Sequence, residues 1–176
     1  MTVSLLLLAL AAAPAGATAT DPKAAVAAVL DDWHKAAAAA DEARYFGHFT
    51  ADGVFLGTDA TERWSRDEFR AWAKPYFSKG KAWSFKPVTR HISVSKDGAL
   101  AWFDETLDTP NLGPSRGSGV LVKEGTTWKI AQYNLSVPIP NDLMDEVMKR
   151  IATYEKSQAA GKAKPATPAP APAPKK

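Results

Sequence analysis

The sequence contains no cysteine, and this absence limits the chemistry open to the chain. Without a thiol there is no disulfide, no thiolate nucleophile and no lipidated cysteine. Histidine is scarce as well: His34, His48 and His91 are the only three, and no two have the spacing of metal ligands. We therefore expect neither a metal site nor a cofactor, and a packing or surface role for each histidine.

Long apolar runs are also missing. No run reaches the roughly 20 apolar residues that a membrane-spanning helix needs. A short run at residues 5–10 is followed by small residues at 15–19, in the pattern that signal peptidase cleaves. We interpret residues 1–19 as an export signal, which predicts a periplasmic or secreted protein. The alternative is an apolar tail or a misplaced start codon, since no Lys or Arg precedes the run.

Acidic and aromatic residues are absent from the other end, residues 159–176. This segment consists mainly of Ala, Pro and Lys, a composition that predicts a disordered or polyproline-like tail. The chain has a formal net charge of +3, and removing the tail's four lysines leaves −1 for the rest. A nearly neutral folded part argues against a nucleic-acid-binding domain. The tail is a solubilising spacer or a contact with an anionic surface.

The remainder, residues 20–158, has the size of one domain and begins with helical patterns. Asp21 as N-cap and Pro22 in the first turn predict a helix through residue 40, followed by a shorter one at 41–49. Ser65 and Glu68 form a capping box for another helix. Pro75 should kink this helix or end its regular part near residues 72–74. A last helix is expected at 141–158.

Period-two alternation predicts the strands. A brief strand at residues 54–57 precedes four longer ones, at 84–95, 100–108, 117–123 and 127–137. Residues 109–114 form a longer loop between two of them. Helices followed by an antiparallel meander indicate an α+β domain and exclude a doubly wound parallel sheet.

Two separated motifs carry a family resemblance. The first is residues 49–59, Phe-Thr-Ala-Asp-Gly-Val-Phe-Leu-Gly-Thr-Asp, followed by Glu62 and Trp64; the second is the Trp-initiated strand at 128–136. In this order they resemble the SnoaL-like branch of the NTF2-like superfamily over most of residues 24–140. The resemblance implies a cone at residues 20–140, with N-terminal helices packed on a curved antiparallel sheet and a pocket between them. The helix at 141–158 follows this domain.

By the resemblance, one face of the last strand looks into the pocket. Strict alternation puts five residues on that face: Trp128, Ile130, Gln132, Asn134 and Ser136. Many relatives carry a His on this strand, where this chain has Gln132 and Asn134. The amides of these two residues cannot titrate near neutral pH. The opposite face is also mostly apolar, which predicts a homodimer through the sheet. The C-terminal helix is the alternative cover.

Asp104 is the candidate general base. It shares a strand face with Trp102 and Thr106, and an enclosed apolar pocket would raise the pKa of an inward carboxyl. Arg116 or Tyr45 would then stabilise an oxyanion. The alternative is a structural ion pair across the sheet.

Asp59 and Glu62 could form a carboxylate pair at the pocket rim. Their alternative role is to accept hydrogen bonds from backbone donors of a loop and of the first helical turn.

Six tryptophans in one small domain suggest an aromatic pocket for an apolar or ring-bearing ligand. The candidate binding residues are Tyr45, Asp59, Glu62, Trp64, Trp102, Arg116, Gln132, Asn134 and Ser136. Three functions remain open: a binding module for an unknown small, partly apolar molecule; a cofactor-free isomerase, cyclase or dehydratase with Asp104 as its base; and a protein-protein module that uses the sheet face.

Overall fold

A computed structural model of the chain describes residues 21–160, with side chains through residue 159. The predicted export signal and residues 161–176 of the predicted tail lie outside the described residues. The helices, in chain order, are α1 (Pro22–Ala38), α2 (Glu42–Gly47), α3 (Arg66–Ser78), a short 3-10 helix η1 (Asn141–Leu143) and α4 (Met144–Ala160). The strands are β1 (Phe49–Leu56), β2 (Arg63–Ser65), β3 (Lys86–Val94), β4 (Leu100–Thr109), β5 (Gly113–Glu124) and β6 (Thr127–Ser136).

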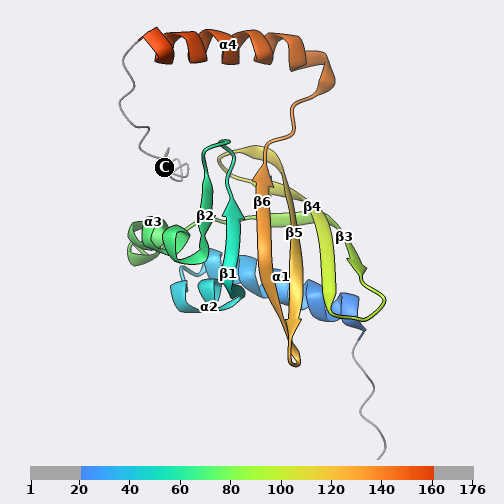
Figure 1. The fold of residues 1–176 in the computed structure, drawn as a ribbon. Coiled ribbons are helices and arrows are strands. Elements are labelled where there is room, and N and C mark those ends of the chain that lie inside the picture. Colours follow the sequence, from blue (N-terminus) through green and yellow to red (C-terminus); the bar gives the residue numbers. More distant parts are fainter. Residues whose placement is uncertain (1–20, 161–176) are drawn as a thin grey trace, which may run out of the picture.

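The strands form one curved sheet in the order β2-β1-β6-β5-β4-β3. Neighbouring strands are antiparallel except for β1 and β6, which run parallel. Helices α1 and α2 pack on one face of the sheet and α3 lies beside β1 and β2, whereas α4 lies apart beyond the end of β6 (Figure 1). The predicted α+β class, with helices on a curved sheet and a further C-terminal helix, is confirmed.

Local capping explains where the first helices begin. The Asp21 carboxylate accepts a hydrogen bond from the backbone N–H of Lys23 (3.1 Å), and Pro22 occupies the first turn of α1. The predicted capping box of α3 is present, because Ser65 and Glu68 accept from each other's backbone N–H groups. Both helix starts therefore lie where the sequence predicts them.

Pro75 does not end the regular part of α3 at residues 72–74, so that one of the two predicted outcomes is wrong: the helix continues to Ser78. Pro75 has no backbone N–H, so the carbonyl of Ala71 loses its donor within the helix. Both residues lie on the exposed side of α3. Water can hydrate that carbonyl, while buried Ala73 and Phe77 keep the opposite side of the helix packed.

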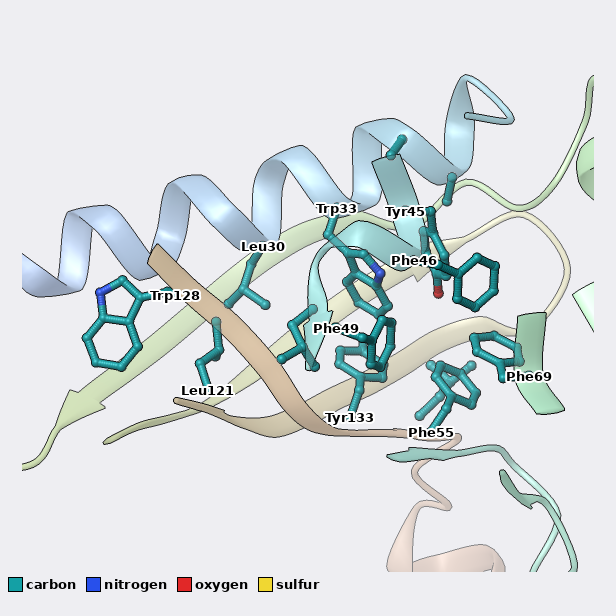
Figure 2. Close-up of a cluster of buried hydrophobic side chains, with 14 of the residues drawn as sticks. Leu30, Trp33, Tyr45, Phe46, Phe49, Phe55, Phe69, Leu121, Trp128 and Tyr133 are labelled. Carbon is teal, nitrogen blue, oxygen red and sulfur yellow. The ribbon is translucent and has the colours of Figure 1, made fainter. Parts of the chain in front are cut away.

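Aromatic side chains fill the core between the helices and the sheet (Figure 2). Trp33 of α1 stacks on Tyr45 of α2, with ring centroids 5.0 Å apart, and meets Tyr133 of β6 edge-on at 4.5 Å. Burying one large apolar side chain contributes about 1.5–3 kcal/mol to the stability of a fold. These rings therefore hold α1 and α2 against the concave face of the sheet.

A β-bulge in β6 changes which side chains face the core. Leu121 of β5 pairs with Ile130 and Val120 pairs with Gln132, so Ala131 is an extra residue in β6. Trp128 and Ile130 are buried before the bulge, and Tyr133 and Leu135 are buried after it. The strict alternation expected for residues 128–136 is therefore wrong beyond Ile130.

The other predicted boundaries of helices and strands differ less from the observed ones. Strand β1 begins at Phe49, five residues before the predicted strand at 54–57, and the three-residue strand β2 was not predicted. Strands β4 and β5 extend into the predicted loop, leaving only residues 110–112 between them. No helix within residues 21–160 is long and apolar enough to cross a membrane.

Candidate functional site

A cavity of about 440 Å³ opens at one end of the cone, between α3 and the sheet. Its walls come from the ends of β1 and β2, from α3, from residues 83–85 and from the turn between β4 and β5. The apolar lining residues are Phe55, Trp64, Phe69, Trp72, Trp83, Phe85, Pro110, Leu112 and Leu135, and the others are Gly57, Thr58, Asp59, Glu62, Ser84, Thr109 and Asn111.

Stacked rings form one wall of this cavity. The rings of Trp64 and Phe69 are almost parallel, at 1° with centroids 5.6 Å apart, and Trp72 lies 5.1 Å from Trp64 at 22°. Phe69 also stacks on Phe55 at 4.0 Å. Trp64 and Trp72 are only half-buried, so part of their surface remains available. Such a flat apolar surface suits a ring-bearing or partly apolar molecule.

The polar part of the lining includes a loop built around two carboxylates. Glu62 Oε2 accepts a hydrogen bond from the backbone N–H of Asp59 (3.2 Å). Asp59 Oδ1 accepts from the hydroxyl of Thr61 (2.6 Å) and from its backbone N–H (2.8 Å), and these bonds hold the pKa of Asp59 below its usual range. Both carboxylates therefore line the cavity and also satisfy donors of their own loop.

Gly57 is required beside this loop. A Cβ at position 57 would lie 2.2 Å from Glu62 Oε2, and the Gly57 N–H donates to the Glu62 carbonyl at 2.8 Å. The absence of a side chain at Gly57 therefore lets Glu62 fold back over the end of β1.

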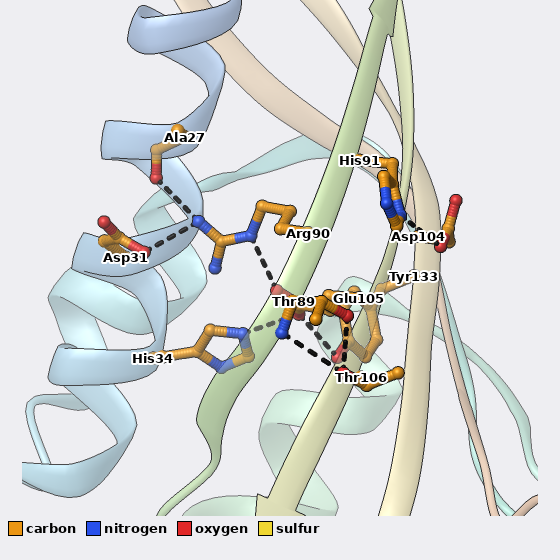
Figure 3. Close-up of polar contacts among 10 residues, drawn as sticks. All are labelled: Ala27, Asp31, His34, Thr89, Arg90, His91, Asp104, Glu105, Thr106 and Tyr133. Atoms are coloured by element: carbon orange, nitrogen blue, oxygen red, sulfur yellow. Dashed lines mark hydrogen bonds and ion pairs between the residues drawn. The ribbon is translucent and has the colours of Figure 1, made fainter.

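A buried carboxylate lies outside the cavity lining, deeper in the core. Glu105 of β4 has no exposed surface, and three side chains donate hydrogen bonds to it (Figure 3). These are His34 Nε2 to Oε1 at 2.7 Å, Arg90 Nε to Oε2 at 2.8 Å and Tyr133 Oη to Oε1 at 3.2 Å. Arg90 also donates from Nη1 to Asp31 Oδ1 at 2.7 Å.

This network settles the charge state of Glu105. Burial alone raises the pKa of a carboxyl group, but the hydrogen bonds that Glu105 accepts from His34 and Arg90, with the charge of Arg90, outweigh burial and lower the pKa of Glu105. A paired carboxylate of this kind ties α1 to the sheet and is not poised to abstract a proton. The sequence carried a signal for it, since Glu105 shares a strand face with the apolar Phe103 and Leu107.

Asp104 points away from the core, so the inward orientation on which its candidacy as a general base depended is not met. Its side chain is 57% exposed, and its Oδ2 lies 3.2 Å from His91 Nδ1 on the face of the sheet opposite α1 (Figure 3). Its suggested role as a general base loses its premise.

The outer face of the sheet, the face turned away from α1, also carries several other predicted binding residues. Trp102 is 52% exposed there, and Arg116 is exposed between Thr106 and Ser136. Because of the bulge, three residues of β6 point the same way: Gln132, Asn134 and Ser136. Their expected position inside the pocket is therefore wrong, and Leu135 lines the cavity instead.

Tyr45 belongs to the core rather than to the cavity. It is fully buried between Trp33 and Phe77, and burial raises the pKa of its hydroxyl well above the usual value. Of the predicted binding residues, the structure therefore brings together only Asp59, Glu62 and Trp64 at the cavity. Three aromatic lining residues were not predicted: Phe69 and Trp72 of α3, and Phe85 from the segment before β3.

Within residues 21–160, no group of three or more His, Asp or Glu side chains is arranged to hold a metal ion. The cavity lining as described offers two carboxylates, hydroxyls, an amide and aromatic faces. This set can bind and orient a small molecule.

Comparisons with known proteins agree with this architecture. A sequence model of the SnoaL-like domain matches residues 26–140, which is more than half of the chain. A comparison with curated proteins gave no match.

Solved structures share the fold at low sequence identity. An NTF2-like protein of unknown function from Pseudomonas putida has a TM-score of 0.57 and 12% identity, over 69% of this chain and 91% of that one. An NTF2-like protein from Cytophaga hutchinsonii has a TM-score of 0.57 and 14% identity, over 68% of this chain and 100% of that one. A protein with a cystatin-like fold from Nostoc punctiforme has a TM-score of 0.56 and 16% identity, over 69% of this chain and 93% of that one.

Proposed function

Because the chain belongs to the SnoaL-like domain family, we propose that it binds a small, partly apolar, ring-bearing molecule in the cavity between α3 and the sheet. The observation that carries this proposal is the stacked aromatic wall of a cavity of about 440 Å³. Ligand sites commonly have this volume, with mostly apolar walls and a few polar groups that orient the ligand.

The positions of the acidic side chains favour binding without a chemical step. The deeply buried carboxylate, Glu105, is neutralised by Arg90 and accepts from three donors, and it does not line the cavity. Asp104, the base of the enzyme hypothesis, is exposed on the other side of the sheet. A proton-transfer role needs a carboxyl group within reach of the bound molecule, and the two that line the cavity, Asp59 and Glu62, accept hydrogen bonds from their own loop.

Two experiments test the binding proposal. Native mass spectrometry of the protein purified from its own host should show a co-purifying small molecule. Trp72→Ala removes one ring of the aromatic wall and should weaken the binding of ring-bearing molecules about tenfold, measured by calorimetry against a ligand panel.

Trp102→Ala is the matched control, because it removes an indole from the outer face and leaves the cavity intact. Equal affinities for the two variants would contradict this site. An empty cavity that no member of a broad panel stabilises would contradict binding altogether.

We also propose that two copies of the chain associate through the outer face of the sheet. Leu100 is 45% exposed and Trp102 is 52% exposed, and the half-buried Val120 and Val122 lie beside them on β5. Helix α4 does not cover this face, so the alternative cover considered from the sequence is absent in the described part of the chain. An apolar patch left open in this way is typical of a protein interface.

Export of the protein remains a proposal that rests on residues 1–19. Expression of the full chain in its host, followed by cell fractionation, should place it outside the cytoplasm with a new N-terminus near residue 20. Recovery of the uncleaved chain in the cytoplasm would contradict export.

A further inference from the structure

The cavity has a charge of one sign. Its described lining includes two carboxylates, Asp59 and Glu62, and no Lys, Arg or His. Neither carboxylate forms an ion pair with a described residue, although ion pairs occur elsewhere on the molecule, as between Asp32 and Arg44. Within residues 21–159, the site therefore presents negative charge without an ion-pair partner next to the aromatic wall.

We propose that the ligand of this cavity is an organic cation, a molecule with an amine or quaternary ammonium group held by Asp59, Glu62 and the indole faces of Trp64 and Trp72. This inference rests on the proposed binding function and names the class of molecule bound.

The aromatic wall and the carboxylates attract the same kind of group. The face of an indole ring carries negative electrostatic potential, and a cation over it gains about 0.5–2 kcal/mol, most when water is excluded. Rings of Trp64, Trp72 and Trp83 line the cavity together with the two carboxylates. A cationic head can therefore contact ring faces and an anionic oxygen in the same cavity, while the apolar part of the molecule packs on Phe55, Phe85 or Leu135.

An anionic ligand does not fit this lining. A carboxylate or phosphate group would approach two negative side chains with no described positive charge to compensate them. At about 4 Å, each like-charge contact costs roughly 1 kcal/mol in water and more in a partly enclosed site. A neutral ring would gain the stacking surface but would leave Asp59 and Glu62 without a charged partner.

The two carboxylates also organise their own loop, so the test must remove charge without removing the hydrogen-bond acceptor. In Glu62→Gln the side-chain oxygen can still accept from the backbone N–H of Asp59, and in Asp59→Asn it can still accept from Thr61. Asp104→Asn is the matched control, since it removes one exposed negative charge on the far side of the sheet.

The experiment measures binding of three probes of similar size to the full chain by calorimetry: benzyltrimethylammonium, benzyl alcohol and phenylacetate. We expect the cation to bind at least about tenfold more tightly than either other probe. Added salt should weaken the binding of the cation and leave the binding of benzyl alcohol unchanged. Glu62→Gln and Asp59→Asn should each lower the affinity for the cation about fivefold or more and leave the affinity for benzyl alcohol unchanged. Asp104→Asn should change neither affinity. Circular dichroism and thermal melting establish that each variant is folded.

Three other outcomes would contradict the inference or the proposed function. If benzyl alcohol binds as tightly as the cation, the cavity is a binding site but its ligand is not cationic. If the cation binds equally to all variants, the carboxylates do not recognise it. If none of the probes binds, both this inference and the proposed function fail for ring-bearing molecules of this size.

Discussion

Glu105 is the residue on which the interior depends most directly. It is fully buried, and its carboxylate joins His34 and Arg90, which reach it from α1 and β3. The adjacent Asp104 has the same charge and the same strand but faces solvent. One position along β4 therefore separates a buried, hydrogen-bonded carboxylate from an exposed one.

Glu105→Gln should destabilise the protein strongly. The substitution leaves the largely buried guanidinium of Arg90 without its buried anionic partner, and breaking such a pair costs about 3–5 kcal/mol. Urea unfolding at pH 7 measures the loss. Asp104→Asn is the control, for which we expect a change within about 0.5 kcal/mol; similar losses in both variants would contradict the assignment.

The same pair of variants gives the pH dependence. Because the pKa of Glu105 is lower in the folded state than in the unfolded state, the unfolded chain binds more protons at acidic pH. The stabilisation is complete above the unfolded value, about 4.3, and is lost as the pH falls through the folded value. Between pH 7 and pH 3 the unfolding free energy of the wild type should therefore fall by more than that of Glu105→Gln. The other carboxylates are the same in both proteins, so their contribution cancels in this comparison.

At the scale of single elements, the bulge in β6 decides the composition of the pocket. The extra residue Ala131 shifts the alternation by one, so that Tyr133 and Leu135 replace Gln132 and Asn134 on the concave face. A bulge also bends its strand and increases the local twist, which suits the curvature of the sheet. Gly119 lies opposite Tyr133 next to this irregularity.

Gly119→Ala should disturb the bulge. A Cβ at position 119 would lie 2.2 Å from the backbone oxygen of Gln132 and 3.0 Å from the ring of Phe103, so the strands would have to separate. We expect a loss of about 1–3 kcal/mol in unfolding free energy. Gly47→Ala, at the end of α2 with no atom within 4 Å of the new Cβ, should change stability little or raise it by about 0.5 kcal/mol. A neutral Gly119→Ala would contradict this packing.

At the scale of the whole fold, two apolar surfaces are left open among the residues that the structure describes. The first is the outer face of the sheet around Trp102, and the second is the exposed side of η1 and α4, with Leu143, Met148 and Tyr154. The proposed dimer uses the first surface, because a sheet face of this kind can meet its copy about a twofold axis.

Trp102→Glu should convert the dimer to a monomer. A buried tryptophan at the centre of an interface commonly contributes about 2 kcal/mol or more, and two introduced carboxylates would repel each other. Size-exclusion chromatography with light scattering at micromolar concentration measures the mass. Tyr154→Glu, on α4, should leave the dimer intact; dissociation by this control instead would assign the interface to α4, and a monomeric wild type would contradict dimerisation.

Local patterns alone predicted much of the architecture. The N-cap at Asp21, the capping box at Ser65 and Glu68 and the period-two alternation from residue 84 onward were enough to order helices before strands. These signals are local, because capping depends on hydrogen bonds within one helical turn and alternation depends on the pleat of one strand. The motif at residues 49–64 also identified Asp59, Glu62 and Trp64, which do line the cavity.

The orientation of the sheet residues was decided by the tertiary structure. Alternation divides Asp104 from Glu105, but it does not say which of the two meets α1, and no local rule predicts the extra residue at Ala131. Pairing of β5 with β6 and packing against α1 select the buried set, because they remove the largest apolar area from water. The sequence thus determined the elements and their order, whereas contacts between distant segments determined which carboxylate is buried and which rings form the cavity.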